Sequence, residues 1–258
     1  MTPERDSETF VQSLARGISV IRAFGASSPI MTLSEVAQRA GVSRAGARRV
    51  LLTLQTLGYV HHDGRRFRLS PKILDLGYSY LSSLDLWDFA EPIMEELVET
   101  VHESCSASVL DGDDIVYVMR VPTHRIMSIN LRVGSRLPAY AASMGRVLLG
   151  SLDDGELDRY LARVTLVPRS RFTVTDTARL GKIVRTDRAK GWSLVDQELE
   201  EGLRSIAVPL SSTGGRVIAA LNISAHASRV TARQMVSDFL PRLQVAQGRI
   251  NESLRMGR

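Results

Sequence analysis

The sequence predicts a protein of the α+β class that is built from two unlike domains. Helical periodicity dominates the first third of the chain, whereas strands and helices are mixed from Cys105 onward. The charge is divided in the same way: residues 1–75 hold eleven Lys or Arg and six Asp or Glu, whereas residues 76–258 hold twenty-two of each. A basic module joined to a neutral one indicates that the first contacts a polyanion and that the second has another task.

Two helices with clear start and stop signals open the basic module. In the segment SLARGISVIRAFG, helical spacing predicts one buried apolar face made of Leu14, Ile18, Ile21 and Phe24. The segment MTLSEVAQRAG offers Thr32 as a helix N-cap, and Glu35 three residues later completes a capping box. This second helix should end at Gly41, where a left-handed residue suits a tight turn.

A third helix and a hairpin follow at once. Ser43 can cap the helix SRAGARRVLLTLQTLG, whose expected apolar face consists of Val50, Leu51, Leu54 and Leu57. Asp63-Gly64 is then a strong signal for a two-stranded hairpin. Helix, short helix, turn, helix and hairpin is the order of a winged helix-turn-helix domain, which we assign to residues 1–72.

The remaining chain should consist of a linker helix over residues 73–89 and a second domain over residues 90–258. Pro92 is expected to interrupt the helical pattern, so the second domain should start with a helix over residues 90–102. Hairpins are predicted at Asp111-Gly112-Asp113 and Gly214-Gly215, with another strand over residues 125–134. Further helices are predicted over residues 141–152, 153–164, 175–191 and 231–255.

Several classes of function are excluded by what the sequence lacks. No apolar run approaches the roughly 20 residues of a membrane span, and the charged N-terminus MTPERDSETF does not resemble a signal peptide, so we expect a cytoplasmic protein. A lone Cys105 makes neither a disulfide nor a thiolate metal site. Neither DGDDI nor ELEE has the partners of a calcium loop or an acid–base pair, and no catalytic or cofactor motif is present. We therefore expect no enzyme, metal or cofactor.

Four segments together resemble the IclR family of bacterial transcriptional regulators over essentially the whole chain. They are SLARGISVIRAFG, LSEVAQRAGVSRAGARRVLLTLQTLGYV, RVPTHRIMSINLRVGSRLPAYAASMGRVLL and DQELEEGLRSIAVPL. Within the family, the chain is most similar to the branch of PcaR, PcaU and PobR type that controls aromatic catabolism. The resemblance implies a GAF-like effector-binding second domain, a linker that helps the protein to dimerise, and dimers that often pair into tetramers. It also implies an effector such as 4-hydroxybenzoate, protocatechuate or β-ketoadipate.

The candidate DNA-binding residues lie at the start of the third helix and at the hairpin tip. Arg44 and Arg48 are four residues apart on one helix face, so either could reach a guanine edge in the major groove. The other candidates should contact phosphates without reading sequence: Ser43, Arg49, Arg65 and Arg66. The alternative to DNA binding is that these residues form a basic surface that contacts only solvent. The order of the helices and the family resemblance disfavour this alternative. His61 and His62 are interpreted as strand residues of the wing.

The candidate effector-binding residues come partly from the resemblance and partly from strand alternation. The resemblance implies pocket walls at Ser143, Met144, Val195, Leu203 and Ser205. The apolar Val195 stands where glyoxylate-responsive relatives place an acidic residue, which indicates a bulkier effector. Asn222 and Ser224 alternate along one predicted strand and therefore share a face, where both could hydrogen-bond one ligand.

A carboxylate effector also needs a cation and an apolar surface. Arg120, Arg132 and Arg136 are the candidate cations, although surface salt bridges are the alternative for each of them. We favour Arg136, because it directly precedes the segment LPAYAASM. Met127, Tyr140 and Trp192 are candidates for contact with an aromatic ring, with core packing as their alternative.

The sequence thus predicts a regulator that binds double-stranded operator DNA under the control of a small carboxylate effector. It should bind the half-sites of the operator as a homodimer or a dimer of dimers. Two other classes stay open: a DNA-binding protein whose second domain only oligomerises, and an enzyme acting on a small acid. The effector's identity, the operator, the regulated genes, and whether transcription is activated or repressed are not specified by the sequence.

Overall fold

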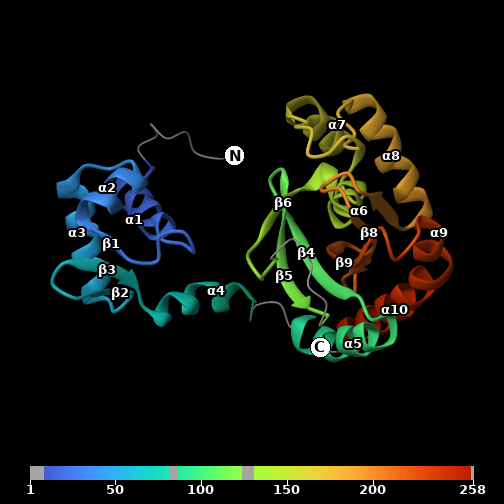
Figure 1. Ribbon diagram of the computed structural model, residues 1–258, viewed down its shortest axis with the longest axis horizontal. Coiled ribbons are helices and arrows are strands. Elements are labelled where there is room, and N and C mark those ends of the chain that lie inside the picture. Colours follow the sequence, from blue (N-terminus) through green and yellow to red (C-terminus); the bar gives the residue numbers. More distant parts are fainter. Residues whose placement is uncertain (1–8, 82–85, 124–130, 257–258) are drawn as a thin grey trace. The chain divides into compact units, whose positions relative to one another are not determined.

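The computed structural model describes residues 9–81, 86–123 and 131–256. The chain separates into two compact units, Met1–Ser83 (unit 1) and Leu84–Arg258 (unit 2) (Figure 1). Unit 1 is mainly helical with a small sheet, and unit 2 combines a larger antiparallel sheet with helices. The predicted α+β class is confirmed.

Three helices contribute to the core of unit 1: α1 (Gln12–Ala23), α2 (Leu33–Ala40) and α3 (Arg44–Thr56). The predicted capping box is present at the start of α2, where the backbone N–H of Thr32 donates to Glu35 Oε2 (2.7 Å). These bonds lower the pKa of Glu35, because they stabilise its ionised form. Gly41 ends α2 with a φ of 66°, so the turn into α3 has the left-handed residue that the sequence predicts.

A three-stranded sheet completes unit 1, with β3 (Arg66–Leu69) between β1 (Met31–Thr32) and β2 (Val60–His62). The carboxylate of Asp63 shapes the turn between β2 and β3, because it accepts the backbone N–H groups of Arg65 (3.0 Å) and Arg66 (2.7 Å). Gly64 adopts a φ of 96° there. The predicted wing is confirmed.

The core of unit 1 differs from the predicted one at three leucine or isoleucine positions. Val20, Leu51 and Phe67 are among the buried residues. Leu14 and Ile18, however, are 64% and 46% exposed, and Leu57 is 52% exposed. Both helices lie where the spacing of apolar residues predicts them. However, only the C-terminal end of α1 and the middle of α3 pack against other elements of unit 1, and spacing alone does not show where helices cross.

The predicted break at Pro92 is wrong. Helix α4 (Leu74–Leu81) follows a short 3₁₀ turn, and α5 runs without interruption from Leu86 to Val101 through the proline. A proline inside a helix removes one backbone hydrogen bond. The buried side chains of Ala90, Met94 and Leu97 offset this loss where α5 packs on the sheet and on α10 (Leu240–Met256).

Unit 2 is organised around a six-stranded antiparallel sheet of order β6-β5-β4-β9-β8-β7. Its strands are β4 (Ser104–Asp111), β5 (Asp114–Val121), β6 (Arg136–Pro138), β7 (Ser193–Asp196), β8 (Leu203–Ser211) and β9 (Val217–His226). Gly112 and Gly215, with φ of 65° and 76°, turn the two predicted hairpins, which are confirmed. Most of the strand predicted over residues 125–134 lies outside the described residues.

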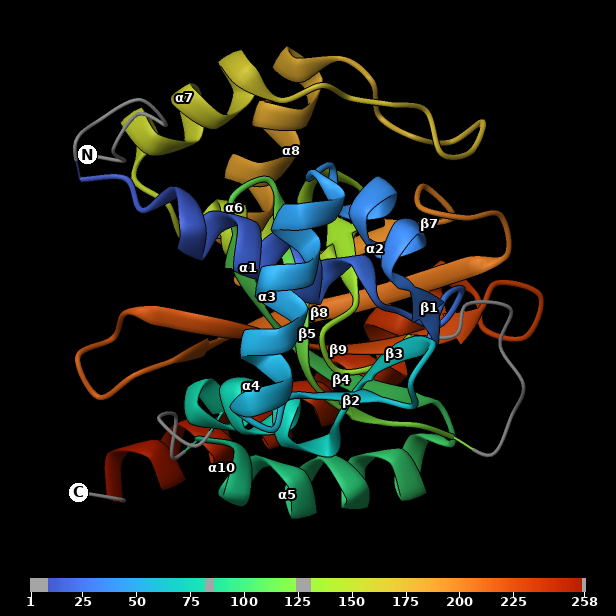
Figure 2. The same ribbon diagram turned by 90° about the vertical axis from the view of Figure 1, so that its left-hand side faces the viewer.

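Helices cover both faces of this sheet. On one face, α5 and α10 lie side by side (Figures 1 and 2). On the other face, a 3₁₀ turn (Ala139–Ala141) leads into α6 (Ser143–Gly150), which contacts β4, β7, β8 and β9. Helix α8 (Thr177–Lys190) packs on α6 and on α7 (Asp154–Arg163), and α9 (Ala232–Gln234) precedes a π-helical turn before α10. No helix in the described ranges is long and apolar enough to cross a membrane.

Candidate functional site

The start of α3 presents a basic surface whose backbone is fixed from within. Ser43 is the N-cap, and its Oγ accepts the backbone N–H of Gly46 (3.1 Å). Arg44, Arg48 and Arg49 are exposed, whereas Ala47 and other residues of the opposite face are buried. The helix therefore holds its arginines outward on a rigid support.

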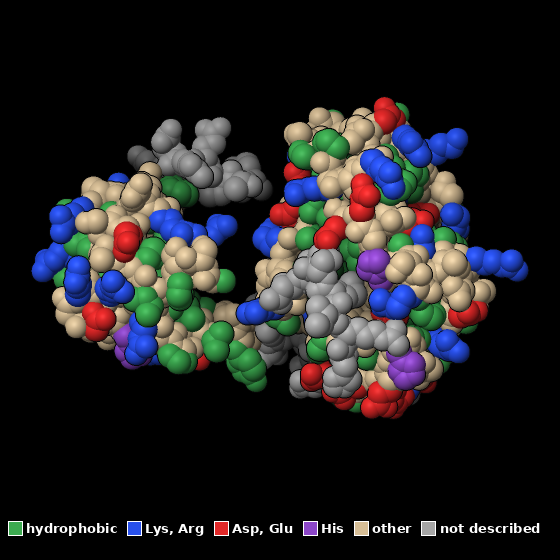
Figure 3. Space-filling model, viewed as in Figure 1, with side chains coloured by type: hydrophobic (Ala, Val, Ile, Leu, Met, Phe, Trp, Pro, Cys, Tyr) green, Lys and Arg blue, Asp and Glu red, His purple; other side chains and the backbone are tan. Residues whose placement is uncertain are grey.

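The arginines of this surface form no ion pairs in the part of unit 1 that the structure describes, although Arg66 lies close enough to Glu35 to help lower the pKa of that carboxyl. None of the three helix arginines, nor Arg65 and Arg66 of the wing, lies within ion-pairing distance of a described carboxylate. Basic side chains gather on the side of unit 1 that carries α3 (Figures 1 and 3). An uncompensated basic surface of this kind suits the phosphates of a nucleic acid.

The two histidines of the wing are strand residues and not ligands of a functional site. His61 and His62 belong to β2, as the sequence predicts. The ring of His62 stacks on that of Phe67, with centroids 4.1 Å apart. They are strand residues beside the basic surface.

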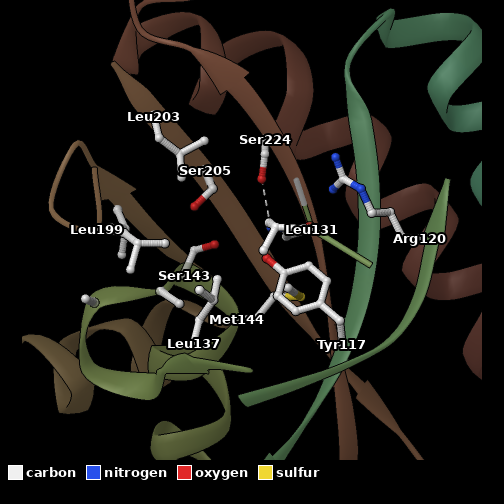
Figure 4. A pocket seen from close by; sticks show the side chains of 14 residues that line it. Tyr117, Arg120, Leu131, Leu137, Ser143, Met144, Leu199, Leu203, Ser205 and Ser224 are labelled. Carbon is white, nitrogen blue, oxygen red and sulfur yellow. Dashed lines mark hydrogen bonds between the residues drawn. The ribbon is translucent and has the colours of Figure 1, made fainter. Parts of the chain in front are cut away.

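A cavity lies in unit 2 between the sheet and the start of α6 (Figure 4). The empty space at this site is about 460 Å³ when open solvent is included, but the part that a water-sized sphere can enter is only about 20 Å³. Seven of the predicted effector residues line it: Ser143, Met144, Val195, Leu203, Ser205, Asn222 and Ser224. The other lining residues are Arg120, which the sequence named as one of three candidate cations, and six that it did not select: Tyr117, Leu131, Leu137, Ala141, Ala142 and Leu199.

A β-bulge places both Tyr117 and Arg120 on the cavity face. Ser108 lies opposite Tyr117 and Ser106 lies opposite Arg120, so the extra residue Val118 shifts the register of β5. Regular alternation would have put Tyr117 and Arg120 on opposite faces of the sheet. A bulge depends on the pairing of two strands, so the sequence of β5 alone does not reveal it.

Small polar side chains form the sheet side of the cavity. Ser106 pairs with Asn222 across β4 and β9, and Ser224 pairs with Ser205 across β9 and β8. Asn222 Nδ2 donates to Ser224 Oγ (3.0 Å), and Arg120 Nη1 donates to Ser106 Oγ (3.1 Å). The alternating serines of SCSAS, residues 104–108, are the sequence signal that could have pointed to this polar face.

Two buried polar atoms at the cavity have no hydrogen-bond partner among the described residues. They are Ser143 Oγ and Asn222 Oδ1. Such an atom costs about 1 to 3 kcal/mol when it stays unsatisfied, so it usually has a partner, which here could be a ligand or water. Burial raises the pKa of Tyr117 to about 12, and the nearby charge of Arg120 only partly opposes this. The phenol therefore stays neutral and can donate a hydrogen bond.

Of the three candidate cations, Arg132 is exposed and does not line the cavity, and Arg120 and Arg136 have opposite surroundings. Arg136 binds Asp111 (2.6 Å) and Asp114 (3.2 Å) at the exposed β4–β5 turn, and these bonds raise its pKa. It does not line the cavity, although the sequence favoured it, because its neighbours in sequence reach the pocket while its own side chain turns to the hairpin. Arg120 lines the cavity and has no ion-pair partner in the described ranges.

The remaining candidates are placed as follows. Met127 lies outside the described residues. The hydroxyl of Tyr140 donates to the carbonyl of Val167 (2.8 Å), so this ring is part of the core and does not line the cavity. Trp192 lies under the ammonium group of Lys190 (5.1 Å), also away from the cavity.

The chain matches two family models and a set of regulators. Residues 13–64 match the IclR helix-turn-helix domain, and residues 78–251 match the C-terminal domain of the bacterial transcriptional regulator IclR. The Pca regulon regulatory protein of Pseudomonas putida is 46% identical over 92% of this chain and 82% of its own length. The p-hydroxybenzoate hydroxylase transcriptional activator of Acinetobacter baylyi is 33% identical over 92% of this chain and 90% of its own.

A solved structure agrees with these matches. The crystal structure of an IclR homologue from Microbacterium hydrocarbonoxydans, complexed with 4-hydroxybenzoate, is 26% identical and superposes with a TM-score of 0.85 over 95% of this chain and 100% of its own. The relatives are named as regulators or activators of transcription, so the protein is a DNA-binding, effector-responsive regulator and not an enzyme. The chain belongs to the IclR family of bacterial transcriptional regulators, in the group of Pca and p-hydroxybenzoate regulators.

Proposed function

We propose that a small carboxylic acid, of the aromatic or β-ketoadipate type, binds in the cavity of unit 2 and thereby controls binding of operator DNA by unit 1. The observation that carries this proposal is Arg120: a guanidinium without an ion-pair partner among the described residues, at a cavity that also holds the unsatisfied Ser143 Oγ and Asn222 Oδ1. One relative is named as the transcriptional activator of p-hydroxybenzoate hydroxylase and another was solved in complex with 4-hydroxybenzoate, and both names support the same class of ligand.

In this proposal the acid lies along the polar face of the sheet. Its carboxylate binds Arg120, which Ser106 holds in place (3.1 Å), at one end of the cavity (Figure 4). A hydroxyl or keto group at the other end reaches Ser143, and Asn222, the cross-strand neighbour of Ser106, contacts the acid nearer its carboxylate. Met144, Val195 and neighbouring apolar side chains contact the ring or chain between these ends: Leu137, Leu199 and Leu203.

For DNA, the N-terminal end of α3 enters the major groove. Arg44 or Arg48 contacts a guanine edge, which discriminates by roughly 1 to 3 kcal/mol. Arg49 contacts a phosphate, and so does Ser43, because its capping Oγ still has a hydroxyl proton to donate. Arg65 and Arg66 add backbone contacts from the wing.

Two such surfaces are needed for an operator with two half-sites, so we propose a homodimer, which could pair into a dimer of dimers. The recognition helices would then address half-sites about 34 Å apart, or a multiple of that spacing. Residues 1–72 would read DNA, residues 73–89 would link, and residues 90–258 would bind the effector. Coupling between the two sites is typically about 1 to 3 kcal/mol, or roughly 5- to 150-fold in affinity.

The test is a pair of titrations on the full chain. Calorimetry with 4-hydroxybenzoate, protocatechuate, β-ketoadipate and uncharged phenol measures binding to the cavity, and fluorescence anisotropy measures affinity for an operator selected from random duplexes. We expect at least one acid to bind more tightly than phenol and to change operator affinity 5-fold or more. If no acid binds and none stabilises the protein thermally, unit 2 serves only in oligomerisation and the proposal fails.

A further inference from the structure

The loop Gln197–Gly202, between β7 and β8, supplies one wall of the cavity through Leu199. Both ends of the loop are in the left-handed region, with φ of 61° at Gln197 and 85° at Gly202. Gln197 closes it by donating its backbone N–H to the carbonyl of Leu203 (2.7 Å) and accepting that of Gly202 at its side chain (3.1 Å). Left-handed backbone at a non-glycine residue needs support from its surroundings.

Glu198 provides that support from inside the protein. Its carboxylate, in the segment ELEE, is buried and binds Arg146 Nη2 (2.6 Å). The same oxygen accepts the backbone N–H of Val174 (3.0 Å). The Glu198 carbonyl also accepts the hydroxyl of Thr173 (2.6 Å), so the loop is fastened at both its side chain and its backbone.

Arg146 connects this loop to the opposite wall. It lies in α6, three residues after Ser143, and its side chain is 2% exposed. Its Nε donates to the carbonyl of Tyr140 (3.0 Å), directly before Ala141 and Ala142, which line the cavity. A single buried ion pair thus fixes the loop, the start of α6 and the turn that precedes it with respect to one another.

We infer that Glu198 is a positioning residue for the effector site: through Arg146 it holds Leu199 against the start of α6 so that the cavity keeps the shape that fits the acid. A buried ion pair is a weak source of stability, because removing two charges from water offsets much of their attraction. Its contribution here is to specify one arrangement of three cavity walls. The part of this inference that concerns the acid rests on the proposed function; the part that concerns the loop does not.

A second buried carboxylate offers a matched control. Glu103 is 1% exposed and binds Arg229 (2.9 Å), but neither residue lines the cavity. Glu103→Gln therefore removes a buried negative charge from the same unit without touching the three walls. Any general effect of losing such a charge on thermal stability should appear in both variants.

The experiment compares Glu198→Gln with Glu103→Gln and with the unchanged protein, all as full chains. Hydrogen–deuterium exchange reports on residues 173–174 and 197–203, and calorimetry with 4-hydroxybenzoate, protocatechuate and β-ketoadipate reports on the cavity. In Glu198→Gln we expect exchange of both segments to rise about 10-fold, acid affinity to fall about 10-fold, and operator affinity without acid to stay unchanged. Glu103→Gln should leave all three unchanged.

The inference is overturned if Glu198→Gln exchanges like the unchanged protein in both segments, or if exchange rises while acid affinity is retained. If the unchanged protein binds none of the acids, the proposed function fails, and the exchange result alone decides whether Glu198 positions the loop. Should Glu198→Gln not fold, the double variant Arg146→Met, Glu198→Leu replaces the pair by apolar side chains of similar size, and the same changes in exchange and affinity are expected of it.

Discussion

The arginines of the two units differ in exposure and in their ion-pair partners. In unit 1 the arginines of α3 and the wing are exposed and have no ion-pair partner among the described residues, whereas every ion pair between described residues lies in unit 2. Buried arginines of unit 2 are paired: Arg146 binds Glu198, and Arg204 binds Asp196 (2.8 Å). Arg120, which lines the cavity without such a partner, is therefore unlike these neighbours and resembles the arginines of unit 1.

The physical cost of an unpaired charge explains what each surface can bind. An exposed guanidinium keeps its water, so unit 1 can present many of them at little cost and bind a polyanion in a salt-dependent way. In a cavity, lost hydration makes each unpaired polar group expensive, so a ligand that satisfies it gains affinity and specificity. Unpaired charge thus points to DNA in one unit and to a small acid in the other.

The largest expected effect tests the DNA half of this comparison. The double variant Arg44→Ala, Arg48→Ala should lose at least roughly 1 to 3 kcal/mol of operator affinity, because it removes whichever of the two arginines makes the bidentate contact to a base. Acid affinity, measured by calorimetry, should not change. Arg216→Ala removes an exposed arginine from the β8–β9 turn of unit 2 and should leave operator affinity as it is. Equal losses of operator and acid affinity in the double variant would contradict the division of labour.

The next effect tests the cavity. Arg120→Met should weaken binding of the acid by about 1.5 to 3 kcal/mol, since a charge-assisted hydrogen bond is lost while the side chain's length is retained. Arg136→Met is the control, because that guanidinium is already bound to Asp111 and Asp114. Calorimetric titrations of both variants with the acid that binds the unchanged protein decide between them. If Arg136→Met lost more acid affinity than Arg120→Met, Arg136 and not Arg120 would bind the carboxylate of the acid.

Features set by neighbouring residues could be predicted from the sequence. The capping box of Thr32 and Glu35, the left-handed Gly41 and the turn at Asp63 each depend on a few adjacent residues, and all three are present. Alternation also placed Asn222 and Ser224 on one face, because β9 is regular there. Helix order then led to the winged helix-turn-helix domain.

Features set by distant residues could not be predicted in this way. The bulge at Val118 brings Arg120 to the cavity only because β5 pairs with β4, and the pairing of Glu198 with Arg146 spans 52 positions. Exposure of Leu14 depends on where α1 crosses its neighbours. The helix persists through Pro92 because tertiary packing offsets a local preference.

Alkaline pH should lower the free energy of unfolding through Tyr117, a buried residue of unit 2. Because burial raises the pKa of Tyr117 to about 12, the unfolded chain ionises first as pH rises above 10, and the folded state loses stability until its own tyrosine ionises. The loss from this residue should reach about 2 to 3 kcal/mol, and Tyr117→Phe should remove it. Urea titrations between pH 8 and 12 measure the free energy of unfolding. Tyr78→Phe, at a 70% exposed position of unit 1, is the control for replacing a tyrosine and should retain the alkaline loss that Tyr117 causes.

The smallest expected effect concerns the wing. The turn at Asp63 uses its carboxylate to bind the backbone of Arg65 and Arg66, which leaves both guanidinium groups available to phosphates. Each phosphate contact adds about 0.9 to the slope of log affinity against log salt, so Arg65→Ala should lower that slope by about this amount. The loss of affinity should be under about 1 kcal/mol near physiological salt and equal for operator and random duplexes, because a phosphate contact reads no bases. Arg163→Ala, which removes an exposed arginine already bound to Asp113 in unit 2, should leave the slope unchanged. If the slope fell equally in Arg65→Ala and Arg163→Ala, the lack of an ion-pair partner would not distinguish arginines that bind DNA from those that do not. That result would contradict the comparison between the two units.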